Sequence, residues 1–260
     1  MCNFANHLHD FQLYIIFFYS NLPKTRLIWN VPFYIINPPR SNLLENVTFY
    51  PTNAKIQVLC KYVTLTERFQ QPIIRPYCGD VPYRINAIRR VKAEDRILYC
   101  GHFYNDDRII ESYWNRLPNY VSIFVQFDSI IGIDLSCTEE LPECAKRWNC
   151  FRNKLFTAYL QNRGVKVIPN VCWWNGADFD YCLDGFSKQS VIAINSTGLR
   201  NNKVSRQIWI EGYKKVVELL EPRFIIRYGA KQAGEYEQIS RYYPNDNQLL
   251  AQERRNDYGR

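Results

Sequence analysis

The sequence lacks the short motifs that assign a chain to a common enzyme class. It contains no Gly-x-Gly-x-x-Gly or Gly-x-x-x-x-Gly-Lys-Ser/Thr stretch, so neither a dinucleotide fingerprint nor a P-loop is supported. No Gly-x-Ser-x-Gly elbow accompanies His102, which argues against a serine hydrolase. Function therefore has to be argued from the positions of polar residues relative to the strands.

The nine cysteines include no Cys-x-x-Cys pair. Zinc sites usually need closely spaced ligand pairs, so a zinc finger is not expected. An odd number of cysteines without a regular framework is typical of reduced thiols in the cytoplasm. We therefore expect a cytoplasmic protein.

Long apolar runs are also missing. The longest near the start, residues 11–19, is far shorter than the ~20 residues that span a bilayer. The preceding residues include His7, His9 and Asp10 but no Lys or Arg, so a signal peptide is not indicated. We expect a buried strand or a loosely ordered aromatic segment there, and no membrane partner.

The composition supports a packed core. The 260 residues are 47% hydrophobic and 22% charged, enough for one large domain or two small ones. The net charge is +8, and residues 1–100 hold 12 Lys or Arg against 6 Asp or Glu. The candidate nucleic-acid contacts in this excess are Arg84, Arg89, Arg90 and Lys92. An ordinary solvated face is the alternative.

Strands and helices alternate after residue 97. Short apolar segments predict strands at residues 97–103, 130–135, 165–171, 190–195 and 223–228. Helical periodicity predicts helices at residues 108–116, 119–127, 142–161 and 205–220, with Ser205 as an N-cap. This order predicts an α/β fold with parallel β/α repeats: a partial or modified β/α barrel, or an open parallel sheet. The five units are fewer than the eight of a full barrel.

The flanking regions differ from this pattern. Residues 1–70 predict an irregular N-terminal extension, in which 56–63 is the best strand candidate. The α/β domain then covers residues 71–229. From residue 230 to 260 aliphatic residues thin out, which predicts a polar tail, either a solvated helix or a disordered segment.

Polar residues follow every predicted strand, and ligand sites of parallel α/β folds form at the carboxyl ends of the strands. The residues at these ends are His102, Asp106, Asp107, Asp134, Ser136, Asn170, Trp173, Trp174, Asn195, Ser196, Thr197, Gly198, Tyr228 and Gly229. Asp106, Asp107 and Asp134 are the acids among them, and together they could hold Mg²⁺ for phosphoryl chemistry.

Each candidate also has a purely structural interpretation. Asp106 and Asp107 precede a helix and could simply cap it, and Asp134 could cap a loop. Ser196 could begin an anion-binding turn or a plain one. Trp174 could stack on a base or sugar, or pack under a loop.

Six segments together resemble a known family. They are HFYNDDRIIESYW (102–114), FDSIIGIDLS (127–136), RWNCFRNKLFTAYLQNRGVKVIPNVCWW (147–174), FDYCLDG (179–185), SVIAINSTG (190–198) and GYKKVVELLEPRFIIRYG (212–229). In order and spacing they resemble the family called domain of unknown function 4417, of phages and other bacterial mobile elements. The likeness covers about half of the chain.

The resemblance implies mobile-element biology and supplies no catalytic residue. Its motifs overlap most of the strand-end residues and add Asn149 and Arg152 as binding candidates. The chain departs from the family pattern at Ile133, where proline is usual. Residues 1–70 have no counterpart, which points to an unusual extension or a misassigned start.

Three functions remain open from the sequence. The first is a metal-dependent enzyme on a phosphorylated or nucleic-acid substrate, with Asp106, Asp107 and Asp134 as acid or metal groups and Mg²⁺ as the candidate ion. The second is a nucleic-acid-binding accessory protein without catalysis. The third is a protein-interaction factor. The sequence indicates no oligomeric state.

Overall fold

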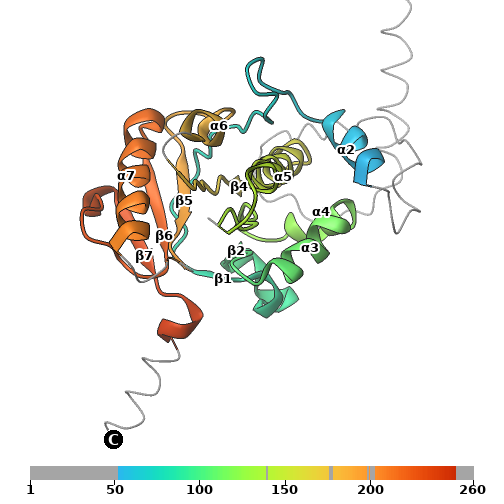
Figure 1. Cartoon of the computed structure of the whole chain (residues 1–260). Helices are drawn as coiled ribbons and strands as arrows, with labels where there is room; N and C mark the ends of the chain where they lie inside the picture. Colours follow the sequence, from blue (N-terminus) through green and yellow to red (C-terminus); the bar gives the residue numbers. More distant parts are fainter. Residues whose placement is uncertain (1–51, 139, 176–177, 198, 200–202, 250–260) are drawn as a thin grey trace, which may run out of the picture. The chain divides into compact units, whose positions relative to one another are not determined.

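The structure is a computed structural model that describes residues 52–138, 140–175, 178–197, 199 and 203–249 (Figure 1). The chain divides into a unit of residues 1–41 and a unit of residues 42–260, and every described residue belongs to the second. The aromatic run at residues 11–19 lies outside the described residues. None of the helices in the described part is both long and apolar enough to cross a membrane.

The described chain alternates strands with helices, as the sequence predicts. The strands are β1 (Ile85–Ala87), β2 (Cys100–His102), β3 (Ser129–Ile131), β4 (Val167–Ile168), β5 (Val191–Asn195), β6 (Phe224–Tyr228) and β7 (Ser240–Tyr243). The helices are α2 (Thr52–Cys60), α3 (Asp107–Asn115), α4 (Leu117–Phe124), α5 (Glu143–Asn162), α6 (Phe179–Leu183) and α7 (Lys203–Leu220). Short 3-10 turns are η1 (Ile88–Arg90), η2 (Ala93–Leu98) and η4 (Glu237–Ile239).

All strand pairs are parallel and follow chain order. One sheet has the order β1-β2-β3-β4 and the other β5-β6-β7. A parallel bridge between Asn170 and Ala193 joins them, so the seven strands form one continuous series. Within the described residues no ladder pairs β1 with β7. The fold is therefore an open parallel α/β sheet, one of the two predicted arrangements, and not a closed barrel.

The sheet is strongly curved. The ring of Tyr104, just after β2, stacks on that of Tyr228 in β6 with centroids 4.5 Å apart, although three strands separate β2 from β6 in the order. At the edges, the hydroxyl of Tyr243 in β7 donates to the carbonyl oxygen of Pro82, just before β1. This curvature brings the ends of distant strands close together.

Helices cover the outer face of the sheet in two apolar clusters. Strands β2 to β4 bury side chains such as Ile130 and Val167 with residues of α2 to α5. Strands β5 and β6 bury Ile192 and Ile225 with Tyr213 and other residues of α7, which lies beside them in Figure 1. The opposite face of the strands is buried as well, because Ile131, Ile168 and Ile226 pack in a third cluster. Burial of both faces explains why the strand sequences are continuously apolar.

The strand predicted at residues 56–63 is wrong, because Thr52–Cys60 forms helix α2. The helix is fixed by contacts that a local pattern does not show. Leu59 is buried in the outer cluster, and the ammonium of Lys55 lies over the ring of Trp114 and donates to its carbonyl oxygen.

The polar tail predicted from residue 230 also needs correction. Residues Ser240–Tyr243 form β7, and its main chain pairs with β6 in parallel. The segment has no aliphatic residue, so its strand character comes from the ladder and from burial of Tyr243. Ser205 lies inside α7, which begins at Lys203, and is not its N-cap.

Candidate functional site

A pocket of about 380 Å³ lies at the carboxyl ends of the strands. Its walls come from the segments after β2, β3, β5, β6 and β7. The lining residues are Tyr104, Asn105, Asp106, Asp134, Ser136, Asn195, Thr197, Tyr228, Asn245, Asp246 and Asn247. We call this hollow the rim pocket. Its size is within the usual range for small-molecule sites.

Asp134 is the most constrained acid of the rim pocket. It follows β3 and is half-buried. Its Oδ1 accepts from Nδ2 of Asn170 at 3.0 Å, and its Oδ2 accepts from Nδ2 of Asn195 at 2.9 Å. Asn170 is fixed in turn because its Oδ1 accepts from the hydroxyl of Tyr104 at 2.9 Å. Residues at or just after the ends of four strands therefore form one hydrogen-bonded chain.

The pKa of Asp134 lies above the ordinary value of an aspartate. Burial raises the pKa of Asp134, and the nearby negative charge of Asp107 raises it further, while the amides of Asn195 and Asn170 act in the opposite direction. Each carboxylate oxygen keeps one lone pair beyond its amide partner. Each oxygen can therefore accept one further hydrogen bond from a ligand in the pocket.

Asp107 stabilises the loop after β3. It is the first residue of α3, and its carboxylate accepts from the Ser136 hydroxyl at 3.1 Å and from the Ser136 main-chain N–H at 3.2 Å. Asn149 on α5 donates to the Ser136 carbonyl oxygen at 2.6 Å. Arg152 donates to Asn149 and to Glu111, both at 2.5 Å. Asn149 and Arg152 therefore act as supports behind the pocket.

Asp106 performs the capping role. It is the N-cap of α3, accepts from the main-chain N–H of Arg108 at 2.9 Å and pairs with the guanidinium of Arg108. The hydrogen bonds from Arg108 lower the pKa of Asp106 to about 2. Asp106 lines the rim pocket, but its negative charge is already paired with Arg108 of its own helix.

Aromatic rings form one wall of the rim pocket. Tyr104 and Tyr228 stack face to face, and His102 lies against Tyr228 with centroids 4.7 Å apart. Burial lowers the pKa of His102 to about 4 and raises that of Tyr228 to about 12. All three rings are therefore uncharged near neutral pH.

Ser196 and Gly229 shape the backbone near the pocket. The hydroxyl of Ser196 donates to the carbonyl oxygen of Ala230 at 2.9 Å, and its side chain is buried. Gly229 has φ +99°, and a Cβ there would lie 2.8 Å from the Ser196 oxygen. These two residues form a tight structural turn.

Trp174 does not line the rim pocket. It is 4% exposed and donates its indole N–H to Glu143 and Asp178, at 3.1 and 3.2 Å. Its ring packs in the core with α6 and α7. The geometry thus gives it the packing role and not that of a stacking platform.

The four basic candidates lie at both ends of β1. Arg84 precedes the strand, whereas Arg89, Arg90 and Lys92 follow it, and all four are exposed. Arg90 pairs at 2.8 Å with Asp246, which lines the rim pocket. Arg90 therefore lies at the margin of the pocket, and Arg89 and Lys92 are its near neighbours in the chain.

The donor set does not fit a metal ion. No group of three or more His, Cys, Asp or Glu side chains that could hold one occurs in the described part of the chain. Both oxygens of Asp134 accept from amides, Asp107 is bound to Ser136, and Asp106 is paired with Arg108. We therefore assign no step to Mg²⁺.

The sequence pattern does not single out several residues of the rim pocket. Asn195 was noted at a strand end, but its bond to Asp134 depends on the bridge between β4 and β5. Tyr104 lies two residues beyond β2. Asn245, Asp246 and Asn247 follow β7, the unpredicted strand. The polar run PNDN (244–247), directly after the aromatic RYY (241–243), is the sequence feature that could have indicated a strand end there.

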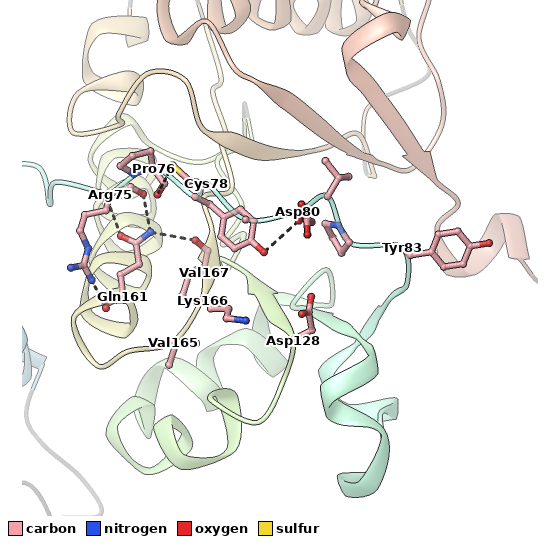
Figure 2. Close-up of a pocket in the computed structure, with 14 residues that line it drawn as sticks. Arg75, Pro76, Cys78, Asp80, Tyr83, Asp128, Gln161, Val165, Lys166 and Val167 are labelled. Atoms are coloured by element: carbon pink, nitrogen blue, oxygen red, sulfur yellow. Dashed lines mark hydrogen bonds between the residues drawn. The ribbon is translucent and has the colours of Figure 1, made fainter. Parts of the chain in front are cut away.

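A larger hollow, of about 600 Å³, lies at the amino ends of β3 and β4 (Figure 2). Its walls include residues 75–83, Asp128 and Lys166. Gln161 accepts from the main-chain N–H of Arg75 at 2.9 Å and donates to the Arg75 carbonyl oxygen at 2.9 Å. These bonds attach residues 75–83 to α5, so we interpret this hollow as structural.

Comparisons with known proteins agree with the resemblance seen in the sequence. The family described as Domain of unknown function (DUF4417) matches residues 81–243, which extends beyond the six resembling segments (102–229) at both ends. The Gene 1 protein of Mycobacterium phage L5 is 31% identical over 164 residues, 62% of this chain and 71% of the relative. The Gene 1 protein of Mycobacterium phage D29 is 30% identical over 164 residues, 62% of this chain and 60% of the relative.

No solved structure matches the chain. The family match covers more than half of the sequence and includes all seven strands, and the relatives come from phages, as the resemblance implies. The chain is thus a member of the DUF4417 family.

Proposed function

We propose that the protein is an enzyme that acts on a nucleotide or nucleic-acid substrate, with Asp134 as the group that gives or takes the proton. The observation that carries this proposal is the position of Asp134. It is half-buried at the carboxyl ends of the strands, oriented by Asn170 and Asn195, and open to a pocket. Catalytic acids with raised pKa values are placed in this way.

The charge distribution supports a defined orientation of the substrate. The described lining of the rim pocket contains no Lys or Arg, so a phosphate inside it would find no cationic side chain to pair with. Amide and carboxylate groups beside an aromatic wall are suited to an uncharged base or sugar. Arg90 at the margin, together with the exposed Arg89 and Lys92 next to it in the chain, is suited to the phosphates outside. The base or sugar would enter the pocket and the backbone would remain at its edge.

The experiment is a product screen with the purified full chain. Nucleoside monophosphates and a mixed-sequence single-stranded DNA would be incubated with the protein, and products would be followed by liquid chromatography and mass spectrometry. We expect turnover of at least one probe, reduced by about 100-fold or more in Asp134→Asn. Asp128→Asn, in the amino-end hollow, is the matched control and should retain activity. Equal turnover by both variants would contradict the role of Asp134.

A nucleic-acid-binding protein without catalysis is the second candidate, favoured by the exposed Arg89, Arg90 and Lys92. Fluorescence anisotropy of a labelled single-stranded DNA would test it. Affinity that falls steeply with salt and is lost when the three residues become Ala, with no product formed, would favour this candidate. Salt-independent affinity would argue against phosphate contacts.

A further inference from the structure

The hydrogen bonds around Asp134 determine which kind of ligand atom this part of the rim pocket can receive. Asn170 donates to one oxygen of Asp134 and accepts from the hydroxyl of Tyr104, so its amide has one possible orientation. Asn195 donates to the other oxygen, and its own Oδ1 accepts from the main-chain N–H of Thr197 at 2.7 Å. Both amides are thus held with their NH2 groups on the carboxylate, and Asp134 is fixed as the acceptor.

Asp134 keeps acceptor capacity on both of its oxygens. A carboxylate has about four lone-pair sites, and the amides of Asn170 and Asn195 use one on each oxygen. Ser136, which also lines the pocket, donates its hydroxyl hydrogen to Asp107 at 3.1 Å and therefore presents lone pairs as well. This part of the pocket is thus suited to an uncharged ligand group that carries two adjacent hydrogen-bond donors.

Two parts of a nucleotide present adjacent donors, the edge of an amino-bearing base and the vicinal hydroxyls of a ribose. Proteins commonly hold a single base by stacking it on an aromatic ring. The rings beside the rim pocket offer little free face, because Tyr104 and Tyr228 stack on each other and are only 8% and 4% exposed. Hydroxyls need no stacking partner, and each can donate to a carboxylate. The geometry therefore favours the sugar over the base.

The position of Arg90 agrees with a sugar at Asp134. Arg90 pairs with Asp246, which lines the rim pocket, so a guanidinium lies at the pocket margin. Of the parts of a nucleotide, the sugar is the one bonded to the phosphate. A ribose in the pocket therefore leaves its phosphate near the margin, where 47% of the Arg90 side chain is exposed and can meet it.

We propose that the two oxygens of Asp134 bind the 2′- and 3′-hydroxyls of a ribose, so that the rim pocket selects ribonucleotides with a free 3′-hydroxyl over their deoxy counterparts. The identity of the ligand as a nucleotide rests on the function proposed above, to which this choice of sugar is added. A deoxyribose has one hydroxyl fewer and leaves one oxygen of the half-buried carboxylate without its ligand bond. Sites built to pair a hydroxyl reject the analogue that lacks it, because a polar group is then left unpaired.

The test compares nucleotides that differ only in the sugar. Isothermal titration calorimetry with the full chain would use adenosine 5′-monophosphate, its 2′-deoxy and 3′-deoxy forms, and the arabinose analogue, whose two hydroxyls lie on opposite faces of the ring. Ribose and 2′-deoxy forms with guanine, cytosine and uracil complete the series. We expect each ribose form to bind about 10-fold or more tightly than its analogues. Equal affinities, a preference for one base whatever its sugar, or no binding of any form would overturn the proposal.

Variants provide the second measurement. Asp134→Asn replaces one acceptor oxygen by an NH2 group and should reduce the ratio of ribose to deoxyribose affinity to less than about 3-fold. Asp128→Asn, in the amino-end hollow, is the matched control and should keep the wild-type ratio. An unchanged ratio in Asp134→Asn would contradict the assignment. If Asp134→Asn fails to fold by circular dichroism, the sugar series on the wild-type chain decides.

Two further comparisons identify the source of the ribose and separate its binding from catalysis. A short RNA that binds with a 3′-hydroxyl end, but not with a 3′-phosphate end, would show that RNA ends are ligands; binding of the free nucleotides alone would restrict the site to them, and both results support the proposal. A ribose preference without any product would support the sugar site and contradict the proposed enzyme. Turnover of DNA that depends on Asp134 and equals that of RNA would do the reverse.

Discussion

The two ends of the parallel sheet carry hollows that differ in chemistry more than in size. The amino-end hollow is the larger, about 600 Å³ against about 380 Å³. Around it, the side-chain amide of Gln161 forms hydrogen bonds with the main-chain N–H and carbonyl oxygen of Arg75 and so connects α5 to residues 75–83. At the carboxyl end, Asp134 is held by two amides and remains open to the pocket. The comparison teaches that converging polar groups, not volume, indicate where chemistry can occur.

The largest expected difference between the two ends is in activity. Asp134→Asn should reduce turnover of any substrate found by about 100-fold or more, because the amide cannot exchange a proton at neutral pH. Asp128→Asn at the amino end should change turnover by less than about 2-fold. Initial rates at saturating substrate measure both. A stronger effect at Asp128 would reverse our assignment of the two hollows.

The second effect is a pH dependence of stability that comes from the carboxyl end. The pKa of His102 is lowered to about 4 from an ordinary 6.5, so the unfolded chain binds more protons between these values. Stability contributed by neutral His102 is therefore present above pH 6.5 and lost as pH falls toward 4, by on the order of 3 kcal/mol.

Urea unfolding at a series of pH values measures this loss. His102→Gln should remove most of the slope between pH 6.5 and 4. The raised pKa of Asp134 acts in the opposite direction, since its contribution is lost as pH rises, so Asp134→Asn should retain the His102 slope. An unchanged slope in His102→Gln would show that the ring is not buried as a neutral group.

The third effect sharpens the role of the turn after β6. Gly229→Ala should destabilise the fold by about 2–3 kcal/mol, because φ is +99° and the new Cβ would meet the Ser196 oxygen at 2.8 Å. Gly234→Ala is the control, with φ +88° but no contact closer than 3.4 Å, and should cost about 1 kcal/mol. Thermal unfolding compares them. Equal losses would mean that the contact with Ser196 adds nothing.

The smallest effect separates Asp106 from Asp134. Asp106→Ala should cost about 1 kcal/mol of stability through loss of the α3 cap and leave turnover nearly unchanged. Asp106→Asn, which can still cap the helix, should recover most of the stability. A loss of turnover in Asp106→Asn without a loss of stability would place Asp106 in the chemistry.

The sequence predicted the parts of the fold in which local pattern and tertiary environment agree. Helix α5 and strands β5 and β6 have clear periodicity or continuous apolar runs and were found nearly within their bounds. The strand-end rule also brought Asp134 and Asn170 together, and they are hydrogen bonded. The elements could be predicted because their pattern lies within one segment, and the contact between Asp134 and Asn170 because the ends of parallel strands meet at one edge of a sheet.

The failures depend on contacts between distant segments. Helix α2 is fixed by Trp114 and its own buried leucine, and β7 by its ladder with β6, so neither has a strong local pattern. The pocket residues Asn245 to Asn247 were missed because their strand was missed. Trp174 lies six residues after the end of β4, and only its bonds to Glu143 and Asp178 show that it faces the core.

The most direct test of the account is a crystal soaked with a nucleoside monophosphate. We predict that its base or sugar occupies the rim pocket within hydrogen-bond distance of Asp134, with the phosphate toward Arg89, Arg90 and Lys92 and the amino-end hollow empty. Density for the ligand in the amino-end hollow, or a phosphate against Asp134, would contradict the account.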